Sequence, residues 1–440
     1  MGKQNKNGFQ CRDKILHYLK VAYLRWSTCN IPVFGLNSQE ISLYQTTKED
    51  ISNGENKSLP DSQYLQSSEN LPIENFNPKG LLDQILQDEN QALLQELTSF
   101  KLVYARDMNS KNEVITLSDF ETLNLIGKGS ISNVYLVKRL EDGQPFAMKS
   151  IRKDLVLDQD LFESTKLEKE LLIRMTSPFF VNLHYAFHSK TKILFIMDFV
   201  RGGDLLMHLL NLGTFTEEIA KFICAQLVLA LGYLHQNEVV YRDLKLENIL
   251  LNQDGYISLV DFGISKRLEN QERTFSVRGT PEYMAPEILT KTGHSFPVDW
   301  WALGTLTYEM VFGQAPFFEE DKTLMFKKIM RQKLRFPKDV QVTSEFKDFI
   351  SLLLHKDPQQ RLGINGHQEV MEHPFFSNLN FNALESKTLD PPYKPQLTQD
   401  AFDVSNFEQE LTSRTTFQDG HLSIGTANLI KQRQSVFKQL

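Results

Sequence analysis

Residues 241–248 read Tyr-Arg-Asp-Leu-Lys-Leu-Glu-Asn, and Asp-Phe-Gly follows at positions 261–263 between apolar runs. The order of these residues puts two carboxylates, one ammonium and one amide oxygen on two adjacent loops. Transfer of a phosphoryl group from ATP needs such a set. A carboxylate orients the acceptor hydroxyl, a cation offsets charge on the moving group, and hard oxygen atoms bind Mg²⁺. The four side chains that would supply these groups are Asp243, Lys245, Asn248 and Asp261.

A glycine-rich stretch lies upstream, where residues 125–134 read Leu-Ile-Gly-Lys-Gly-Ser-Ile-Ser-Asn-Val. Gly127 and Gly129 allow a tight turn whose backbone amides can approach phosphate oxygens, because no Cβ stands in the way. Ser132 takes the place of a third glycine in this pattern and keeps a small polar side chain there. The next expected strand ends in Ala-Met-Lys at Lys149, so a cation follows the glycine turn.

Two downstream segments complete the pattern. Gly-Thr-Pro-Glu-Tyr-Met-Ala-Pro-Glu occupies 279–287, and Asp-Trp-Trp-Ala-Leu-Gly occupies 299–304. Together with the upstream motifs they make the chain resemble the protein kinase family. The resemblance implies an α+β, bilobal protein-kinase fold, with a β-rich N-lobe over a mainly helical C-lobe and ATP at the seam. It also implies that Arg361 pairs with Glu287 in a buried ion pair that serves folding rather than chemistry.

The resemblance assigns a role to each polar residue of the two loops. Asp243 would be the catalytic base that orients a protein Ser or Thr hydroxyl, and Lys245 would offset charge on the moving phosphoryl group. Asn248 and Asp261 would hold Mg²⁺. The implied cofactors are therefore ATP and Mg²⁺.

Nucleotide binding is implied for a set of residues in the N-lobe and the hinge. Lys149 would bind the α- and β-phosphates and would be held by Glu168, for which Glu163 and Glu170 are nearby rivals. Met197 is the expected gatekeeper, and residues 198–200 form the expected hinge. The expected binding set is Ile126, Gly127, Lys128, Gly129, Ser130, Ile131, Ser132, Val134, Ala147, Lys149, Glu168, Met197, Asp198 and Val200.

Several features resemble one group of kinases in particular. The catalytic loop begins with Tyr241 rather than histidine, and the activation segment ends Arg-Thr-Phe-Ser-Val-Arg-Gly-Thr at 273–280. The segments 391–395 and 406–412 follow the catalytic domain. These features resemble the AGC group of serine/threonine kinases, including the cyclic-AMP-dependent kinase and protein kinase B types, over about residues 120–440. In that group a C-terminal tail wraps both lobes.

The resemblance also predicts a phosphorylation switch at Ser276. Phosphate there would add nearly two negative charges and bind Arg242 and Lys266 through charge-assisted hydrogen bonds. Without phosphate, an unpaired Arg242 is expected to disorder the segment. Thr274 is the rival site. An upstream activating kinase is an expected partner.

Substrates are expected to be proteins with arginine two and three residues before the acceptor and an apolar residue just after it. Three carboxylates stand where basophilic relatives bind guanidinium groups, which pair with carboxylates through two parallel hydrogen bonds. These are Asp204, Glu247 and Glu309, and the expected apolar pocket is formed by Val277, Pro281 and Met284.

Two other functions stay open at this point. A nucleotide-binding pseudokinase scaffold is mildly favoured by Ser132 and opposed by Lys149, Asp243 and Asp261. A small-molecule phosphotransferase is opposed by the Gly-Thr-Pro-Glu segment, which presents a peptide in kinases.

Composition agrees with a cytoplasmic enzyme with access to the nucleus. The chain has 440 residues, 41% of them hydrophobic, and a net charge of −7, which argues against nucleic-acid binding. Its three cysteines have no metal-ligand spacing. The apolar run 222–234 is too short to span a bilayer and predicts a buried helix. We expect no signal peptide and no transmembrane segment, and a monomer that is open to a regulatory partner.

The first 119 residues resemble no domain. Ile15, Leu19, Ala22 and Trp26 have helical spacing in a basic arm, which could pack on the kinase domain or bind an acidic surface. Acylation at Gly2 is disfavoured because Lys6 stands where the motif requires Ser or Thr. The expected divisions are this arm at 1–34, a disordered linker at 35–79, an amphipathic helix at 80–105, the protein kinase domain at 120–376 and an AGC-type tail at 377–440.

The tail ends in Phe437-Lys438-Gln439-Leu440. In the AGC group an F-x-x-F motif near the end of the tail docks in a hydrophobic groove of the N-lobe. Leu440 replaces the second phenylalanine here, so Phe437 is the expected anchor, and a frayed terminus is the alternative.

Overall fold

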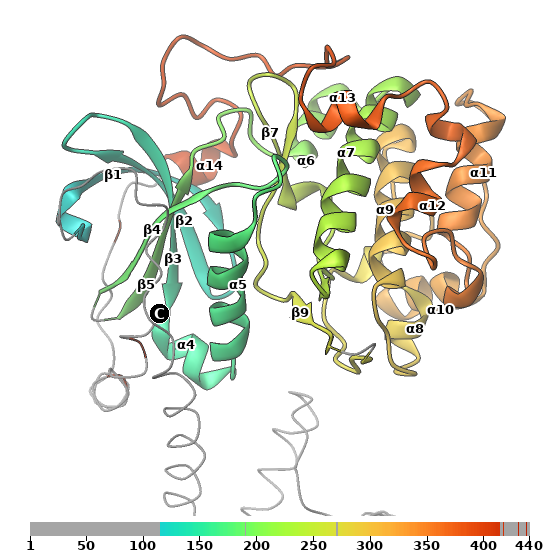
Figure 1. The fold of residues 1–440 in the computed structure, drawn as a ribbon, viewed down its shortest axis with the longest axis horizontal. Coiled ribbons are helices and arrows are strands. Elements are labelled where there is room, and N and C mark those ends of the chain that lie inside the picture. Colours follow the sequence, from blue (N-terminus) through green and yellow to red (C-terminus); the bar gives the residue numbers. More distant parts are fainter. Residues whose placement is uncertain are drawn as a thin grey trace, which may run out of the picture. The chain divides into compact units, whose positions relative to one another are not determined.

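A computed structural model describes residues 115–189, 191–269, 272–413, 417, 430 and 437. The described residues form a β-rich N-lobe and a mainly helical C-lobe, which confirms the expected α+β class (Figure 1). The segments expected at 1–34, 35–79 and 80–105 lie outside the described residues.

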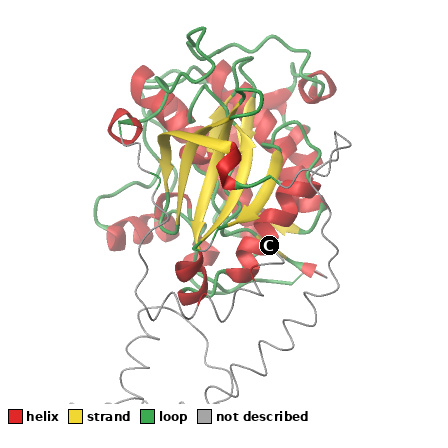
Figure 2. Cartoon of the chain, turned by 90° about the vertical axis from the view of Figure 1, so that its left-hand side faces the viewer, coloured by secondary structure: helices red, strands yellow, loops and turns green. Residues whose placement is uncertain are grey.

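The N-lobe is built on a five-stranded antiparallel sheet with the order β1-β2-β3-β5-β4. Figure 2 shows these strands side by side as one twisted sheet. Strands β3 and β5 are buried along most of their length, as their nearly continuous apolar sequences predict. The elements are β1 (Phe120–Lys128), β2 (Ser132–Arg139), β3 (Pro145–Arg152), α4 (Lys153–Asp158), α5 (Phe162–Arg174), β4 (Leu183–His188) and β5 (Lys192–Asp198).

The C-lobe packs helices around α7 (Glu217–Gln236) and α9 (Pro297–Phe312). Thr216 caps the start of α7 by accepting a hydrogen bond from the Ile219 amide, and Gly313 ends α9 in a left-handed conformation. The other helices are α6 (Leu205–Leu212), α8 (Pro286–Leu289), α10 (Lys322–Arg331), α11 (Ser344–Leu353), α12 (His367–Met371) and α13 (Phe381–Glu385). Four short strands line the seam, namely β6 (Val239–Val240), β7 (Ile249–Leu251), β8 (Ile257–Leu259) and β9 (Lys266–Arg267).

Helix α7 carries the apolar run that the sequence places inside the protein. By length and composition it is the one helix among the described residues that could cross a membrane. However, 67% of its most apolar window is buried, and it contacts α9 and α12. It is therefore the core helix of the C-lobe.

The expected ion pair between Glu287 and Arg361 is present and buried. Two nitrogens of the Arg361 guanidinium donate to the two carboxylate oxygens of Glu287 over 2.6 and 2.9 Å, and one also donates to the Pro297 carbonyl over 2.8 Å. The pair ties the end of the activation segment to the start of α9 and to the loop after α11.

The C-terminal tail contacts both lobes. On the C-lobe, the Tyr393 hydroxyl lies 2.9 Å from Nδ1 of the buried His208. At the hinge, the ring of Phe407 stacks on Phe199 with centroids 5.7 Å apart. Helix α14 (Gln409–Thr412) then packs on β1, where the Asn124 amide donates to the Thr412 carbonyl over 2.9 Å.

Phe437 is buried in the N-lobe, with 0% of its surface exposed. Its ring packs against Phe162 of α5 at a centroid distance of 6.3 Å, and the Lys153 ammonium of α4 lies 4.8 Å from its centroid. The prediction that Phe437 docks on the N-lobe is confirmed. Leu440 lies outside the described residues.

Replacing Phe437 by Ala should lower the melting temperature by a few degrees, because the loss of one buried phenyl ring removes about 2 kcal/mol of stabilisation. Peptide phosphorylation should fall with it, since the ring supports α5. Phe318→Ala is the matched control, because Phe318 is an exposed phenylalanine of the C-lobe. Equal melting temperatures for the two variants would show that the tail end is not an anchor.

Candidate active site

One buried carboxylate, Asp299 at the start of α9, fixes the backbone of the catalytic loop. Its oxygens accept the amide hydrogens of Tyr241 over 2.9 Å and Arg242 over 2.8 Å. Nε2 of His235 lies 2.8 Å from the same carboxylate. The anchor supports a left-handed conformation at Arg242, whose φ is +68°, an uncommon value for a residue with a side chain. The loop therefore presents Asp243 at a fixed position.

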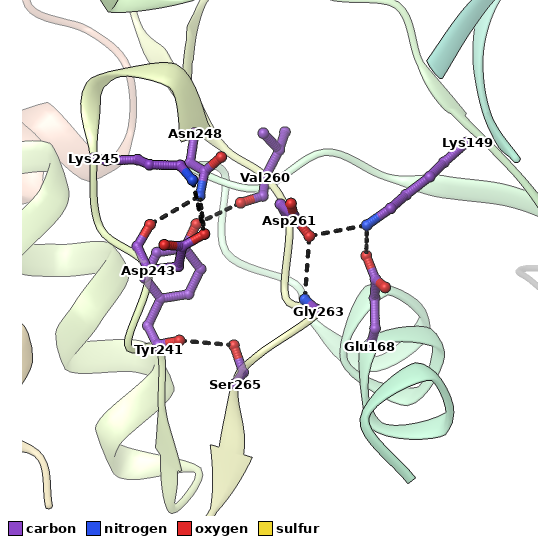
Figure 3. A network of polar contacts seen from close by, with 10 residues as sticks. All are labelled: Lys149, Glu168, Tyr241, Asp243, Lys245, Asn248, Val260, Asp261, Gly263 and Ser265. Atoms are coloured by element: carbon purple, nitrogen blue, oxygen red, sulfur yellow. Dashed lines mark hydrogen bonds and ion pairs between the residues drawn. The ribbon is translucent and has the colours of Figure 1, made fainter. Parts of the chain in front are cut away.

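The Asp243 carboxylate is held by three neighbours, of which Figure 3 shows Asn248 and Lys245. Nδ2 of Asn248 donates to Oδ2 of Asp243 over 3.0 Å, and Nζ of Lys245 lies 3.1 Å from the same oxygen. The Thr280 hydroxyl of the activation segment donates to Oδ1 over 3.1 Å. The structure thus joins the predicted base, its cation and the substrate-presenting segment at one carboxylate.

Lys149 of β3 bridges the two lobes. Its ammonium lies 2.5 Å from Oε1 of Glu168 in α5 and 2.9 Å from Oδ1 of Asp261 (Figure 3). Burial alone would lower the pKa of Lys149, but the two carboxylates outweigh it and the pKa is raised, so the cation persists at neutral pH. The pKa of Asp261 is lowered, chiefly by Lys149. The rival acid Glu170 instead pairs with two arginines of the surface.

The donor set fits Mg²⁺. The amide nitrogen of Asn248 holds Asp243, so its oxygen is the atom left for a cation, and Oδ1 of Asp261 takes Lys149 and the Gly263 amide, which leaves Oδ2. Asp261 is steadied by the buried Phe262 ring. In the described part of the chain no three His, Cys, Asp or Glu side chains are placed so that they could hold a metal ion together. Two protein oxygens suit an ion that completes its shell with phosphate and water.

The glycine-rich turn between β1 and β2 closes through its backbone. The Gly129 amide donates to the Ser132 carbonyl over 2.7 Å, and a Cβ at Gly129 would lie 3.1 Å from the Ser132 hydroxyl. Ser132 in the third position is therefore compatible with the turn, provided that residue 129 stays small. The other residues predicted for the nucleotide lie on β1, on β2, in the turn between them, on β3, on α5 and at the end of β5, around one seam.

The hinge has an anchor that sequence reasoning missed. The Asp198 carboxylate accepts the amide hydrogen of Asn182 over 2.9 Å and its side-chain amide over 2.7 Å, and Nε2 of His184 lies 2.6 Å away. These contacts tie the first hinge residue to β4. Asn182 directly precedes β4 and His184 lies on it, with no motif of their own, so the signal was absent from the sequence.

Of the three predicted guanidinium-binding acids, Asp204 and Glu309 are half-buried, whereas Glu247 is exposed. Burial, followed by Glu247, raises the pKa of Glu309 to about 7, although the Tyr283 hydroxyl donates to its carboxylate. Burial and Glu247 likewise raise the pKa of Asp204 to about 6. Oδ1 of Asp204 also accepts the Met207 amide and so caps α6. Because Glu247 repels both of the other acids, a cation bound between them would stabilise their charged forms.

The activation segment brings Ser276 to Arg242. Nη1 of Arg242 donates to the Ser276 hydroxyl over 2.7 Å, and its Nε donates to the Ile264 carbonyl over 2.8 Å. The expectation that Arg242 stays unpaired without phosphate is therefore wrong. Lys266 lies 3.5 Å from the Thr274 hydroxyl. Thr274 is buried in a β-bridge, whereas Ser276 is partly exposed, which favours Ser276 as the modified residue.

The residues expected to form an apolar pocket beyond the acceptor belong to the activation segment and the loop that follows it. Met284 and Thr280 line a small cavity together with Asp243, and Pro281 and Val277 belong to the same stretch of chain. The structure therefore places Met284 beside the catalytic loop, and the role of these residues in substrate specificity stays a prediction.

Comparison with known proteins agrees with this geometry. Protein kinase 2 of Dictyostelium discoideum is 43% identical over 69% of this chain and 63% of its own length. Serine/threonine-protein kinase YPK1 of Saccharomyces cerevisiae is 42% identical over 69% of this chain and 44% of its own length. Human RAC-beta serine/threonine-protein kinase is 40% identical over 72% of this chain and 66% of its own length.

The chain thus spans less than two thirds of the length of these relatives. The protein kinase domain family matches residues 120–376. The match covers more than half of the chain and includes the seam with its lysine, its two loops and the activation segment. The chain belongs to the protein kinase family, with relatives among the serine/threonine kinases of the AGC group.

Proposed function

We propose that this protein transfers the γ-phosphoryl group of ATP to Ser or Thr hydroxyls of proteins that carry arginine before the acceptor. The observation that carries the proposal is the assembled set of Lys149, Glu168 and Asp261 beside a fixed Asp243. A scaffold without turnover has no need of an aligned base, so this set favours catalysis over the pseudokinase alternative.

In the proposed mechanism, residues of the N-lobe place the triphosphate and residues of the C-lobe place the acceptor. Lys149 would contact the α- and β-phosphates, held by Glu168. Bound Mg²⁺, held by Asn248 and Asp261, would neutralise charge on the phosphate oxygens. Positioning and charge neutralisation then supply most of the rate.

The oxygen of the substrate hydroxyl would bond to the γ-phosphorus while Asp243 accepts the hydroxyl proton. The bond from the γ-phosphorus to the bridging oxygen would break at the same time, and ADP would leave. Lys245 lies 3.1 Å from the Asp243 carboxylate and is placed to offset charge on the moving group. Thr280 fixes the other carboxylate oxygen, so the base has one orientation.

Specificity for arginine would come from Glu247 and Glu309, with Asp204 in support. Burial, and then repulsion from Glu247, raises the pKa of Glu309 in the free protein, and a guanidinium that enters between the two acids would relieve the repulsion. Since that pKa is about 7, affinity for arginine-bearing peptides should fall as pH drops from 7.5 to 6, where the carboxyl group gains a proton.

Activation would follow phosphorylation of Ser276 by an upstream kinase. The Ser276 hydroxyl already lies within hydrogen-bond distance of Arg242, so a phosphate there would meet a cation directly. The pKa of Arg242 is lowered by burial and by Arg278 to about 10, so it stays charged at neutral pH. A phosphate on Ser276 would offset the repulsion between the positive charges of Arg242 and Arg278.

Asp243→Asn should lower the turnover number for a peptide substrate about 10²-fold or more, because orientation and proton acceptance contribute in that range. Lys149→Met should abolish transfer while the far-UV circular dichroism spectrum stays that of the wild type. Transfer of ³²P from labelled ATP to an arginine-bearing peptide measures both. Near-wild-type turnover of the Asp243 variant would contradict the mechanism.

Glu247→Lys should raise the KM of a peptide with arginine at positions −2 and −3 at least tenfold, with little effect on a peptide that has alanine there. Reversal of one charge beside Glu309 removes the pairing site for guanidinium. Glu372→Lys is the control, since Glu372 lies in the C-lobe on α12's C-terminal cap, outside the residues assigned here. An equal loss for both peptides would show that Glu247 has another role.

A further inference from the structure

The activation segment pairs with the loop before α9 through one isolated antiparallel bridge. The amides of Thr274 and His294 each donate to the other's carbonyl over 2.9 Å. On one face of this ribbon, Phe275 is 64% exposed and packs over Gly293, where an added Cβ would lie 2.8 Å from the phenyl ring. Because side chains alternate along extended chain, Thr274 and His294 face inward together.

The inward face is where the Ser276 hydroxyl lies. Oγ1 of Thr274 is 3.3 Å from Oγ of Ser276, which accepts the hydrogen bond from Arg242. Directly opposed residues on one face have Cβ atoms about 5 Å apart. The Cβ atoms of Thr274 and His294 therefore lie close together, and Arg242 and Lys266, the two cations next to the Thr274 and Ser276 hydroxyls, act electrostatically on the imidazole.

His294 has an unsatisfied polar atom. The residue is 3% exposed, and its Nε2 is buried with no hydrogen-bond partner among the described residues. Buried polar atoms in native proteins nearly always have partners, so the Nε2 atom of His294 has the capacity for one further hydrogen bond. Neighbouring hydroxyls and cations specify an acceptor with negative charge.

Four charged groups act on His294 from the elements packed around it. Arg242 and Lys266 disfavour a positive imidazole, and Glu287 and Asp299 favour one. Both acids are engaged elsewhere, with Arg361 and with the catalytic-loop amides respectively. Burial, followed by Arg242, lowers the pKa of His294 to about 4, so the imidazole is neutral at physiological pH.

We propose that His294 is a ligand of the phosphate on Ser276, to which its Nε2–H donates a hydrogen bond beside Arg242 and Lys266. This inference rests on the proposed phosphorylation of Ser276. The phosphate would offset the two cations and supply the acceptor that Nε2 lacks. Proton affinity of His294 would rise, so that phosphorylation and protonation stabilise the same ordered segment.

The direction of the pH effect follows from the two states. Without phosphate, the ordered segment holds His294 below the usual histidine pKa of about 6.5, so order is lost as pH falls from 7 toward 4. With phosphate, the raised pKa reverses this trend, and the segment holds its phosphate more firmly at pH 6 than at pH 7.5.

The test uses full-length protein phosphorylated on Ser276, with occupancy measured by mass spectrometry. The readouts are peptide kinase activity and the rate at which a phosphatase removes the phosphate, expressed relative to a free phosphopeptide at each pH. His294→Phe removes the ligand, and His294→Gln keeps a donor that does not titrate. His373→Phe is the matched control, since His373 is a buried histidine of the C-lobe far along the chain.

We expect His294→Phe to lose its phosphate about tenfold faster than wild type, as a hydrogen bond to a charged group is worth about that factor. His294→Gln should keep most of the protection at pH 7.5 but not gain protection at pH 6. His373→Phe should match wild type. Nuclear magnetic resonance titration of the His294 ring in wild type should show a pKa above about 6.5 with phosphate, against about 4 without it, which is a proton affinity more than about 300-fold higher.

Wild-type protection in both His294 variants, or a His294 titration that phosphate leaves unchanged, would overturn the inference. If His294→Phe does not fold, the Gln variant and the titration decide. A failure of the proposed activation by Ser276 phosphorylation can be told apart from a failure of the His294 proposal. In the first case Ser276→Ala would be as active as the phosphorylated wild type.

Discussion

The position of Lys149 between Glu168 and Asp261 is the interaction on which the rest of the structure depends. One buried ammonium joins three elements that belong to different parts of the chain, namely β3, α5 and the loop after β8. A buried cation is costly unless it is paired, and here two carboxylates pair with it. Since Asp261 belongs to the C-lobe, the same contact sets the seam where the nucleotide would bind.

The other features of the fold support that contact from a distance. Asp299 fixes the catalytic loop, so Asp243 and Asn248 stay beside Asp261. The tail supports the opposite side, because Phe437 packs against α5, the helix that carries Glu168. The site is therefore built from buried charged side chains with fixed partners. The apolar core and the tail keep those partners in place.

Much of this could be predicted from the sequence, because most of the decisive residues stand in short motifs that are recognisable on their own. The catalytic loop, the glycine turn and the segment at 279–287 are short motifs, and the choice of Glu168 over its neighbours follows from the family resemblance. Asp204 was predicted as a substrate-binding acid, and the structure adds a second use as the cap of α6. That hydrogen bond was not predicted, although an aspartate directly before an apolar helical run is a common N-cap signal.

The contacts that sequence reasoning missed are those between segments without motifs. His294 lies opposite Thr274 only because the chain folds back on itself, and His184 meets Asp198 across two paired strands. The pairing of Arg242 was also predicted wrongly, since the Ile264 carbonyl and the Ser276 hydroxyl accept hydrogen bonds from it without any phosphate. Such pairings depend on tertiary register, which local spacing does not encode.

The most direct test of the account compares two acids of the same helix. Glu168→Gln removes the carboxylate that holds Lys149, whereas Glu170→Gln removes one that pairs with Arg174 and Arg267. The measurement is ³²P transfer from ATP to an arginine-bearing peptide. We expect kcat/KM to fall about 10²-fold for Glu168→Gln and to stay within about threefold of wild type for Glu170→Gln. Equal losses in the two variants would contradict the claim that the Lys149 ion pair organises the site.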